Sequence, residues 1–414
     1  MNGFRYSVVA SPLHDQRSVD RITEPVRRQL VALGGGAANG EADVDVELDA
    51  ERPHVVVVAT GGTERAVLDL VRRRRAVVPW EPVVLVAHPL HNSLAASIES
   101  MARLRSDGVR GCVVQATELL VDREALAGAI SDLSVLFAVR GSRIGLVGEP
   151  SDWLVASVPT AVDLRARWGI ELVDIGIGDT IDRTRRVDAA EARPVAVRFT
   201  AKGVPTAETV AAAALHPALV DGIEQAGVDA VAVRCFDFIT ELATSGCVAL
   251  AELNDTGVVA GCEGDVASTV AMMLVRELTG RPSWIANPAR IDASTNSLLL
   301  AHCTVAPSMV DDLELHTHFE SGLGVGLRGT FAPGPVTLLR LGGTSLERHW
   351  FAEAEVVEAG ASPDLCRTQV TVRVADDHPV GRLLDDPLGN HLVMVQGHHG
   401  ERLERWWRLA FGDQ

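Results

Sequence analysis

One glutamate stands at a corner of the sequence where packing alone does not explain it. Glu263 lies between Cys262 and Gly264 in "VVAGCEGDVASTVAMMLVREL", where an apolar run becomes an amphipathic helix. Asp265 is placed to favour the positive N-terminal end of that helix, so its carboxylate has a structural explanation. Glu263 precedes the helix, and a carboxylate there can bind a metal ion or transfer a proton. We therefore expect Glu263 to have a functional role.

Two histidines supply the partners that a carboxylate needs in a metal site. His302 ends the apolar segment "NSLLLAH", and His391 opens the apolar segment "HLVMVQG". Together with Glu263 they form an oxygen and nitrogen donor set suited to Mn²⁺, with Mg²⁺ and Co²⁺ as alternatives. A single histidine at a strand end is more often a hydrogen-bonded structural residue, and this alternative stays open for each of the two.

Other polar side chains lie where strands are expected to end. The segment "AHPLHNSLAASIES" places Asn92 after an apolar strand, at the edge where α/β sheets bind ligands, although a capped turn explains it equally well. The segment "LHTHFESG" adds His318 and Glu320. The glycine pattern "GVGLRG" at 324–329 is not a dinucleotide site, because β-type sequence continues on both sides of it.

The elements that position these residues follow two patterns. In the first third, apolar strands such as "HVVVVAT" and "PVVLVAH" alternate with amphipathic helices, which predicts a parallel sheet covered on both faces. A second unit of this kind begins near "SRIGLVGEP". From about residue 306, short β-type segments alternate with Gly and Pro turns, which is typical of an antiparallel barrel or sandwich. We expect α/β domains at 1–141 and 142–305 and a β-rich, barrel-like domain at 306–414.

Composition excludes several functions. The 414-residue chain has a net charge of −17, which argues against nucleic-acid binding because such binding depends on clustered cations. No apolar run is long enough to cross a bilayer, and no secretion signal is recognisable, so we expect a cytoplasmic protein with no membrane partner. The six cysteines lack CxxC spacing and are expected to be reduced thiols.

Several motifs together resemble a known superfamily. The segments "AGCEGDVASTVAMMLVRELTG", "SWIANPARID", "LLLAHC" and "GNHLVMVQGHHGERLERW" are similar to the L-fucose isomerase and L-arabinose isomerase superfamily, in particular its L-fucose isomerase-like branch. The resemblance spans about residues 229 to 408. It implies two α/β domains followed by a β-barrel, in agreement with the layout above. It also implies a homo-oligomer, a trimer or hexamer, with active sites at subunit contacts.

The resemblance also implies a reaction and roles for individual residues. Members interconvert aldoses and ketoses with a divalent cation, commonly Mn²⁺. Glu263 resembles the glutamate that is both metal ligand and proton-transfer base, while His302 and His391 resemble histidine ligands. A metal that chelates the carbonyl and neighbouring hydroxyl of the sugar acidifies the C–H between them, and a carboxylate then moves that proton between adjacent carbons through an enediol.

The chain departs from this pattern at the second carboxylate. After the short strand "SWI" it has Asn287, whose amide can offer an oxygen ligand but cannot take a proton at neutral pH. Asp292, Glu320 or Asp237 could fill that role, and we expect Asp292 and Asp237 to be the catalytic candidates beside Glu263. The residues expected to contact a sugar or polyol are Asn287, His318, Glu320, Asn390 and Asn92.

Three functions remain open from the sequence. The first is metal-dependent aldose–ketose isomerisation. The second is another enolate-type reaction in the same pocket, such as epimerisation or carbon–carbon cleavage. The third is a non-catalytic sugar-binding protein that kept the fold and lost the second carboxylate.

Overall fold

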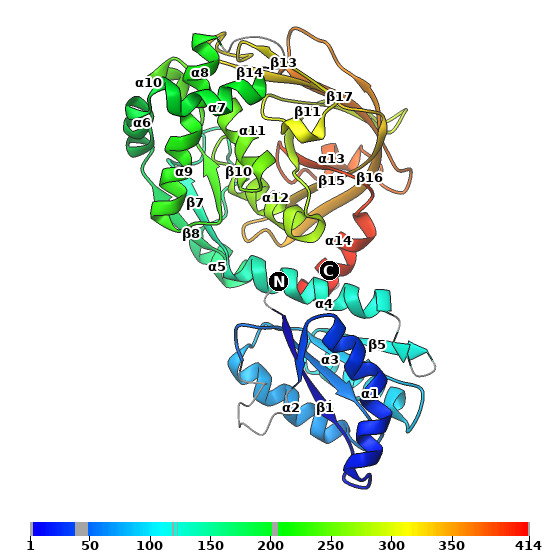
Figure 1. The fold of residues 1–414 in the computed structure, drawn as a ribbon. Helices are drawn as coiled ribbons and strands as arrows, with labels where there is room; N and C mark the ends of the chain where they lie inside the picture. Colours follow the sequence, from blue (N-terminus) through cyan, green and yellow to red (C-terminus); the bar gives the residue numbers. More distant parts are fainter. Residues whose placement is uncertain (1–2, 38–48, 118–119, 122, 201–205, 413–414) are drawn as a thin grey trace. The chain divides into compact units, whose positions relative to one another are not determined.

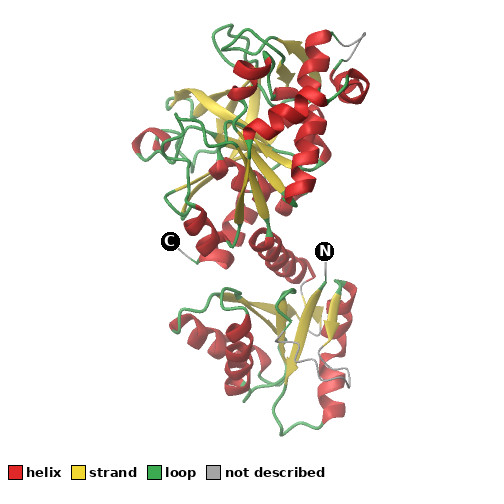
Figure 2. Cartoon of the chain, turned by 90° about the vertical axis from the view of Figure 1, so that its left-hand side faces the viewer, coloured by secondary structure: helices red, strands yellow, loops and turns green. Residues whose placement is uncertain are grey.

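The computed structural model describes residues 3–37, 49–117, 120–121, 123–200 and 206–412. They form two compact units, one made of Met1–Ala138 with Glu404–Gln414 and the other of Val139–Leu403. Each unit is described by itself. Figure 1 labels the elements along the chain, and Figure 2 distinguishes helices from strands in a view turned by 90°.

The first unit contains a sheet of order β2-β1-β3-β4-β5-β6 in which β1 to β5 run parallel. Its middle strands β3 and β4 are buried along their whole length. Alternate side chains enter different cores, because successive residues of a strand point to opposite faces. Val55 and Val57 pack in one cluster and Val56 and Val58 in another, so helices cover both faces. The strands are β1 (Phe4–Val9), β2 (Gly35–Ala37), β3 (His54–Val58), β4 (Val83–Ala87), β5 (Gly111–Thr117) and β6 (Leu120–Val121); the helices are α1 (Gln16–Ala32), α2 (Glu64–Val77), α3 (Ser93–Ser106), α4 (Arg123–Gly141) and α14 (Gly400–Phe411).

The second unit begins with a four-stranded parallel sheet of order β10-β9-β7-β8. Its strands are β7 (Arg143–Val147), β8 (Glu171–Ile175), β9 (Ala230–Val233) and β10 (Val259–Gly261). The helices around it are α5 (Ala161–Trp168), α6 (Ile177–Arg186), α7 (Ala189–Phe199), α8 (Ala207–Ala213), α9 (Leu215–Ala226), α10 (Phe236–Leu242), α11 (Cys247–Thr256) and α12 (Val266–Thr279). Helix α12 is buried on nearly every side, which explains its almost continuous apolar sequence.

A closed antiparallel barrel of order β11-β12-β17-β16-β15-β18 completes the second unit. Its strands are β11 (Trp284–Asp292), β12 (Ser297–His302), β15 (Gly334–Gly342), β16 (Arg348–Ala359), β17 (Thr368–Val374) and β18 (Leu392–Gln396). A separate hairpin, β13 (Asp312–His316) with β14 (Gly326–Thr330), and the short helices η2 (Pro307–Met309) and α13 (Arg382–Asp385) lie between them. The expected fold class, parallel α/β sheets followed by an antiparallel barrel, is confirmed.

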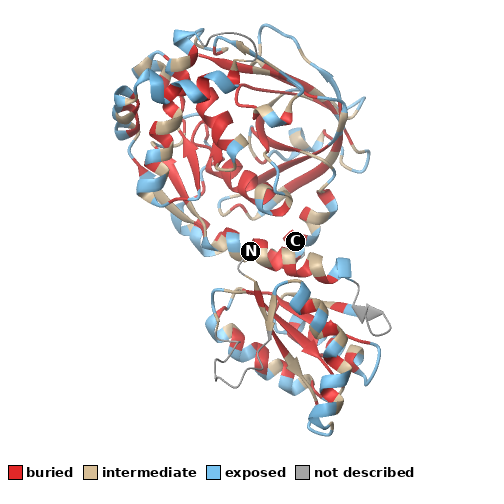
Figure 3. Cartoon of the chain, in the orientation of Figure 1, coloured by how far each residue is buried: buried red, intermediate tan, exposed pale blue. Residues whose placement is uncertain are grey.

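Two boundaries differ from the sequence-based layout. Strands β11 and β12 precede residue 305, yet they pair with β18 and β17 in the barrel and not with the second parallel sheet. The C-terminal residues from Glu404 belong with the first unit, where Leu409 joins the core of the sheet. Figure 3 shows the buried strands of both units. Among the residues described, the helices fall short of the length and apolar character that a bilayer crossing requires.

Candidate metal centre

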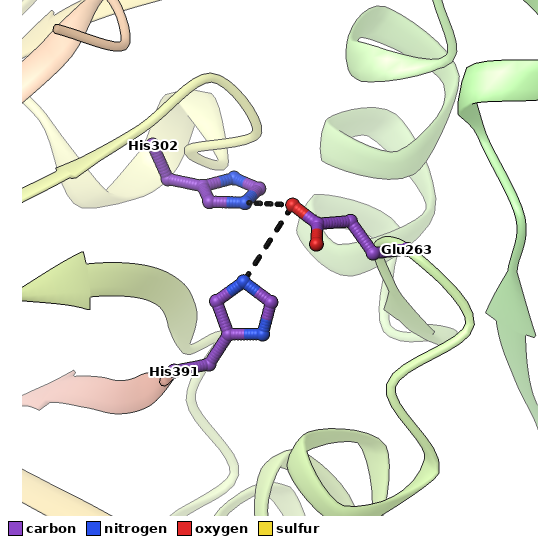
Figure 4. Close-up of side chains that lie close together, drawn as sticks. All are labelled: Glu263, His302 and His391. Carbon is purple, nitrogen blue, oxygen red and sulfur yellow. Dashed lines mark ion pairs between the residues drawn. The ribbon is translucent and has the colours of Figure 1, made fainter. Parts of the chain in front are cut away.

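Three side chains from separate elements of the second unit meet at one point. Glu263 lies in the corner between β10 and α12, His302 is the last residue of β12, and His391 immediately precedes β18. Glu263 Oε1 is 3.6 Å from His302 Nε2 and 3.6 Å from His391 Nε2. Both rings point toward the carboxylate in Figure 4. The predicted trio is therefore brought together, and one ligand atom from each residue lies within 4.8 Å of the others.

The corner that carries Glu263 is held in an uncommon backbone conformation. Glu263 has a φ of 61°, in the left-handed region that costs an L-residue with a side chain about 1–2 kcal/mol. The next residue, Gly264, has a φ of 69°, and a Cβ there would lie 2.8 Å from Glu149 O. Backbone hydrogen bonds fix the corner: Ser151 N donates to Glu263 O at 2.9 Å. Such conformations persist where the surrounding structure enforces them, and they cluster at functional sites.

A hydrogen bond at Nδ1 fixes the orientation of each histidine ring. His391 Nδ1 donates to Asp265 Oδ2 at 2.8 Å, and His302 Nδ1 is 3.0 Å from Thr304 Oγ1. The Nε2 atom of each ring is thereby directed at Glu263. Metal-binding histidines usually show this arrangement, in which a neighbour holds one nitrogen and leaves the second for the ion.

Asp265 does more than the helix-capping role predicted for it. It caps α12 by accepting from Ser268 N at 2.8 Å, and it is completely buried. Its Oδ2 also lies 3.3 Å from Arg340 Nη1, whose side chain is 1% exposed. Arg340 donates further to Ser268 Oγ at 2.8 Å and to Ser157 Oγ. The helix cap thus joins His391 to a buried arginine of the barrel, a link that the sequence did not indicate.

The charges at the centre are strongly coupled. Burial disfavours the ionised form of Glu263, but the two facing histidines outweigh it and hold the pKa of this carboxyl well below its usual range. Burial disfavours protonation of His391, but Asp265 and Glu263 raise its pKa to about 9. Burial likewise opposes ionisation of Asp265, whose pKa is lowered to about 2 by Arg340 and His391. The ionised carboxylates of Glu263 and Asp265 therefore stabilise a positive charge at this point.

The donor atoms fit a divalent cation. Bonds of about 2.0–2.2 Å place neighbouring ligand atoms roughly 2.8 to 3.6 Å apart in octahedral or tetrahedral geometry. The observed separations of 3.6 Å lie at the upper end of this range. A divalent ion held by Glu263, His302 and His391 would supply the positive charge that a proton on His391 otherwise provides.

A small cavity and a larger groove adjoin the cluster. The cavity, of about 40 Å³, is lined by Glu263, His302 and Asn287. That volume holds an ion and a few waters. The groove, of about 390 Å³, shares Phe236, Ile239 and Glu320 with the cavity. Of these two spaces, the groove is the one that reaches the volume of roughly 300 Å³ or more that small-molecule sites have.

Most of the other expected site residues lie beside these spaces. His318 is buried, lines the cavity and lies 3.0 Å from Ser321 Oγ through Nδ1. Glu320 lines both spaces, and Asp237 lines the groove, where it pairs with Arg234 at 3.1 Å. Asn390 Nδ2 donates to Asn287 Oδ1 at 3.4 Å, which ties Asn390 to the same cavity wall.

One expected residue lies away from the cluster within the second unit, and another belongs to the first unit. Strand β11 is nine residues long and ends at Asp292. This residue pairs with Ser297 at the end of the β11–β12 hairpin that lies far from Asn287. Asp292 is five positions along the strand from Asn287, or roughly 16 Å. The Asp292 carboxylate accepts from Ser294 N and Oγ in the turn, so within this chain it does not supply a second carboxylate to the cluster. Asn92 belongs to the first unit, where it precedes α3 with a φ of 55°.

Sequence reasoning missed one close partner of Glu263. Trp153, in the loop between β7 and α5, donates its indole Nε1–H to Glu263 Oε2 at 2.5 Å. The cavity wall also includes Cys235 and Cys262, whose sulfurs are 3.0 Å apart. The available signal for Trp153 was its place in "GEPSDWL", directly after a parallel strand, because ligand-binding loops follow the carboxyl ends of such strands.

Comparison with known proteins finds similarity to one kind of sugar isomerase. The chain is similar to sulfoquinovose isomerases. The protein from Clostridium sp. (strain MSTE9) is 29% identical over 151 residues, which are 36% of this chain and 31% of that protein. The proteins from Priestia aryabhattai and Priestia megaterium are each 25% identical over 193 residues, which are 44% of this chain and 42% of each relative. The chain thus matches less than half of the length of these relatives. No protein-family model matches it.

Proposed function

We propose that this protein is a metal-dependent sugar isomerase that interconverts an aldose and a ketose. The observation that carries the proposal is the convergence of Glu263, His302 and His391, with Oε1 3.6 Å from both Nε2 atoms. The similarity to sulfoquinovose isomerases, at 25–29% identity, supports an isomerase acting on a sugar. The superfamily resemblance of the sequence supports the same reaction class.

The residues of the chain would bind the metal ion and transfer the proton. When bound, a divalent metal would act as a Lewis acid toward the carbonyl oxygen of the sugar. His302, His391 and Glu263 Oε1 would hold that ion. Glu263 Oε2 lies on the side of Trp153, which lines the groove, and would take the proton from the carbon beside the carbonyl and return it to the adjacent carbon.

A second acid is available for the proton that moves between the oxygens of the sugar. Glu320 borders both the cavity and the groove, and Asp237 borders the groove alone. Asn287 stands where the resemblance places a carboxylate, and its amide can bind an ion or a hydroxyl but not accept a proton. We therefore infer that Glu320 is the second proton carrier, with Asp237 as the alternative.

We propose Mn²⁺ as the ion, although two histidines and a carboxylate also suit Fe²⁺ and Co²⁺. Elemental analysis of the purified protein decides between these metals. The homo-oligomer with active sites at subunit contacts, the sugar or polyol substrate and the cytoplasmic location remain predictions. Sedimentation at several protein concentrations tests the first of them.

Conversion of sugars in D₂O tests the reaction. The metal-loaded protein should convert an aldose to its ketose and leave deuterium at the carbon beside the carbonyl, as followed by NMR. Deuterium incorporation with an epimer, or with shorter fragments, would instead assign an epimerase or a carbon–carbon lyase to the same pocket. Sugar binding that persists in a chelator without turnover would assign a binding protein and refute the isomerase.

A further inference from the structure

The groove beside the metal cluster has an aromatic wall. Trp153 is 51% exposed although its indole nitrogen is bound to Glu263. Its ring meets the Phe236 ring edge-on, with centroids 5.0 Å apart, and Phe236 meets the His318 ring in the same way at 5.4 Å. The hydrogen bond at the indole nitrogen fixes the ring, and the exposed part of the ring offers a flat apolar surface to a ligand.

That surface is suited to one face of a sugar. A pyranose carries C–H groups on its faces and hydroxyl groups at its rim, so its apolar face can cover the exposed indole while its hydroxyls reach polar neighbours. The indole N–H also holds Glu263 Oε2, which leaves Oε1 toward the two histidines. Trp153 therefore connects the groove directly to the carboxylate assigned to proton transfer.

The charges of the groove favour hydroxyl donors over anions. Asp237 and Glu320 line it, and carboxylates accept hydrogen bonds from hydroxyl groups. Arg234 is the one cation among the described residues that line it, and its charge is engaged by Asp237 at 3.1 Å and Asp152 at 3.3 Å. Arg234 Nη1 also donates to Pro150 O at 2.7 Å. An anionic substituent would meet uncompensated negative charge.

We propose that this groove is the subsite for an uncharged sugar, with Trp153 as its stacking platform and Asp237 and Glu320 as acceptors for its hydroxyls. The inference rests on the proposed function and narrows it, because it selects neutral aldoses over sugars that carry a sulfonate or phosphate. It also makes Trp153 a positioning residue for the Glu263 carboxylate.

Fluorine NMR of the full-length protein labelled with 5-fluorotryptophan tests the proposal. The resonance missing from Trp153→Phe identifies Trp153 among the seven tryptophans of the chain. The Mn²⁺-free protein is titrated with neutral aldohexoses, each paired with its 6-phosphate, and with D-quinovose paired with sulfoquinovose. Neutral members should move the Trp153 resonance saturably, and their charged partners should bind at least tenfold more weakly. Trp153→Ala should weaken neutral binding more than Trp153→Phe does.

A second variant tests the charge argument by itself. Asp237→Asn releases one partner of Arg234, and the affinity for sulfoquinovose relative to D-quinovose should then rise by about tenfold, as expected for one freed charge near a surface. Equal or tighter binding of the charged sugars by the unmodified protein would overturn the proposal, as would a Trp153 resonance that no sugar moves.

The outcomes separate this inference from the isomerase assignment. Sugar conversion with a silent Trp153 resonance would refute the subsite and leave the isomerase standing. Saturable shifts by neutral sugars without any product would retain the subsite and refute the isomerase.

Discussion

His391 and Asp265 form a hydrogen bond of 2.8 Å between Nδ1 and Oδ2, and both side chains are completely buried. One residue precedes a barrel strand, and the other caps the helix that follows the Glu263 corner. The bond therefore connects the barrel to helix α12 and keeps His391 close to Glu263. It also directs His391 Nε2 at Glu263.

Replacing Glu263 with glutamine should abolish turnover without unfolding the protein. Glutamine keeps the shape of the side chain but cannot take a proton, and general-base catalysis contributes about 10²–10⁴-fold in rate. Initial rates of the metal-loaded variant and its circular dichroism spectrum check both statements. Glu171→Gln, at a half-exposed position paired with Arg143, is the matched control and should keep full activity. A Glu263→Gln protein that retains most of its activity would remove Glu263 from the assigned role.

Removing either histidine should weaken metal binding. His302→Ala and His391→Ala each delete one donor aimed at Glu263 Oε1, so the Kd for Mn²⁺ should rise by at least tenfold in each variant. Titration calorimetry after chelator treatment provides the measurement. His398→Ala is the control, because His398 is exposed and pairs with Glu353 and Glu355 instead. Unchanged Mn²⁺ affinity in His391→Ala would exclude that residue as a ligand.

Arg340 should matter for stability and for metal affinity together. Arg340→Met removes one partner of the buried Asp265 carboxylate, and the loss of one partner of a buried ion pair typically costs about 3–5 kcal/mol of unfolding free energy. Loss of such a supporting partner should also weaken Mn²⁺ binding about 10–100-fold. Urea unfolding and calorimetry check the two effects.

Arg373→Met is the matched control on the same barrel. Its ion pair with Asp376 is exposed, so the change should cost less than about 1 kcal/mol and leave metal binding alone. If the two substitutions changed the unfolding free energy and the Mn²⁺ affinity equally, Arg340 would not support the metal centre.

The first unit should lose stability in mild acid through His54. This side chain is buried, lies 2.9 Å from Ser7 Oγ and has a pKa lowered to about 3 by burial and by the charge of Arg74. Between pH 6.5 and about 3 the unfolded chain therefore binds a proton that the folded chain does not, so stability falls as pH falls. From pH 7 to pH 5 this group alone should cost about 2 kcal/mol.

Urea unfolding at the two pH values, in chelator, checks this dependence. His54→Gln can still bond to Ser7 but does not titrate, so its loss of stability between pH 7 and pH 5 should be smaller by that amount. Identical losses in both proteins would mean that His54 titrates normally in the folded state.

The fold was predictable where apolar patterns were strong. Strands such as β3 and β4 are continuous valine and leucine runs because helices cover both faces of their sheet. The same property misled the assignment of β12. Its apolar run "SLLLA" reads alike in a parallel sheet and in a barrel, so the sequence did not reveal that β11 and β12 pair with β18 and β17.

The site was predictable to the extent that it lies at strand ends. Glu263 follows an apolar strand, His302 ends one and His391 precedes one, and strand ends of one unit can meet. Asp292 lies away from the cluster of its own chain because β11 continues past Pro288, through an irregularity in its pairing, to the opposite end of the hairpin. Trp153 lies in a loop without periodicity, so only the three-dimensional structure shows its bond to Glu263.

Metal stoichiometry tests the central claim most directly. The protein is purified without chelator or affinity metal, its metal content is measured, and the chelator-treated protein and its Glu263→Gln variant are titrated with Mn²⁺. The account predicts close to one ion per chain in the unmodified protein and a Kd at least tenfold higher in the variant. No bound metal and no Mn²⁺ binding up to millimolar concentration would contradict a metal centre at Glu263, His302 and His391.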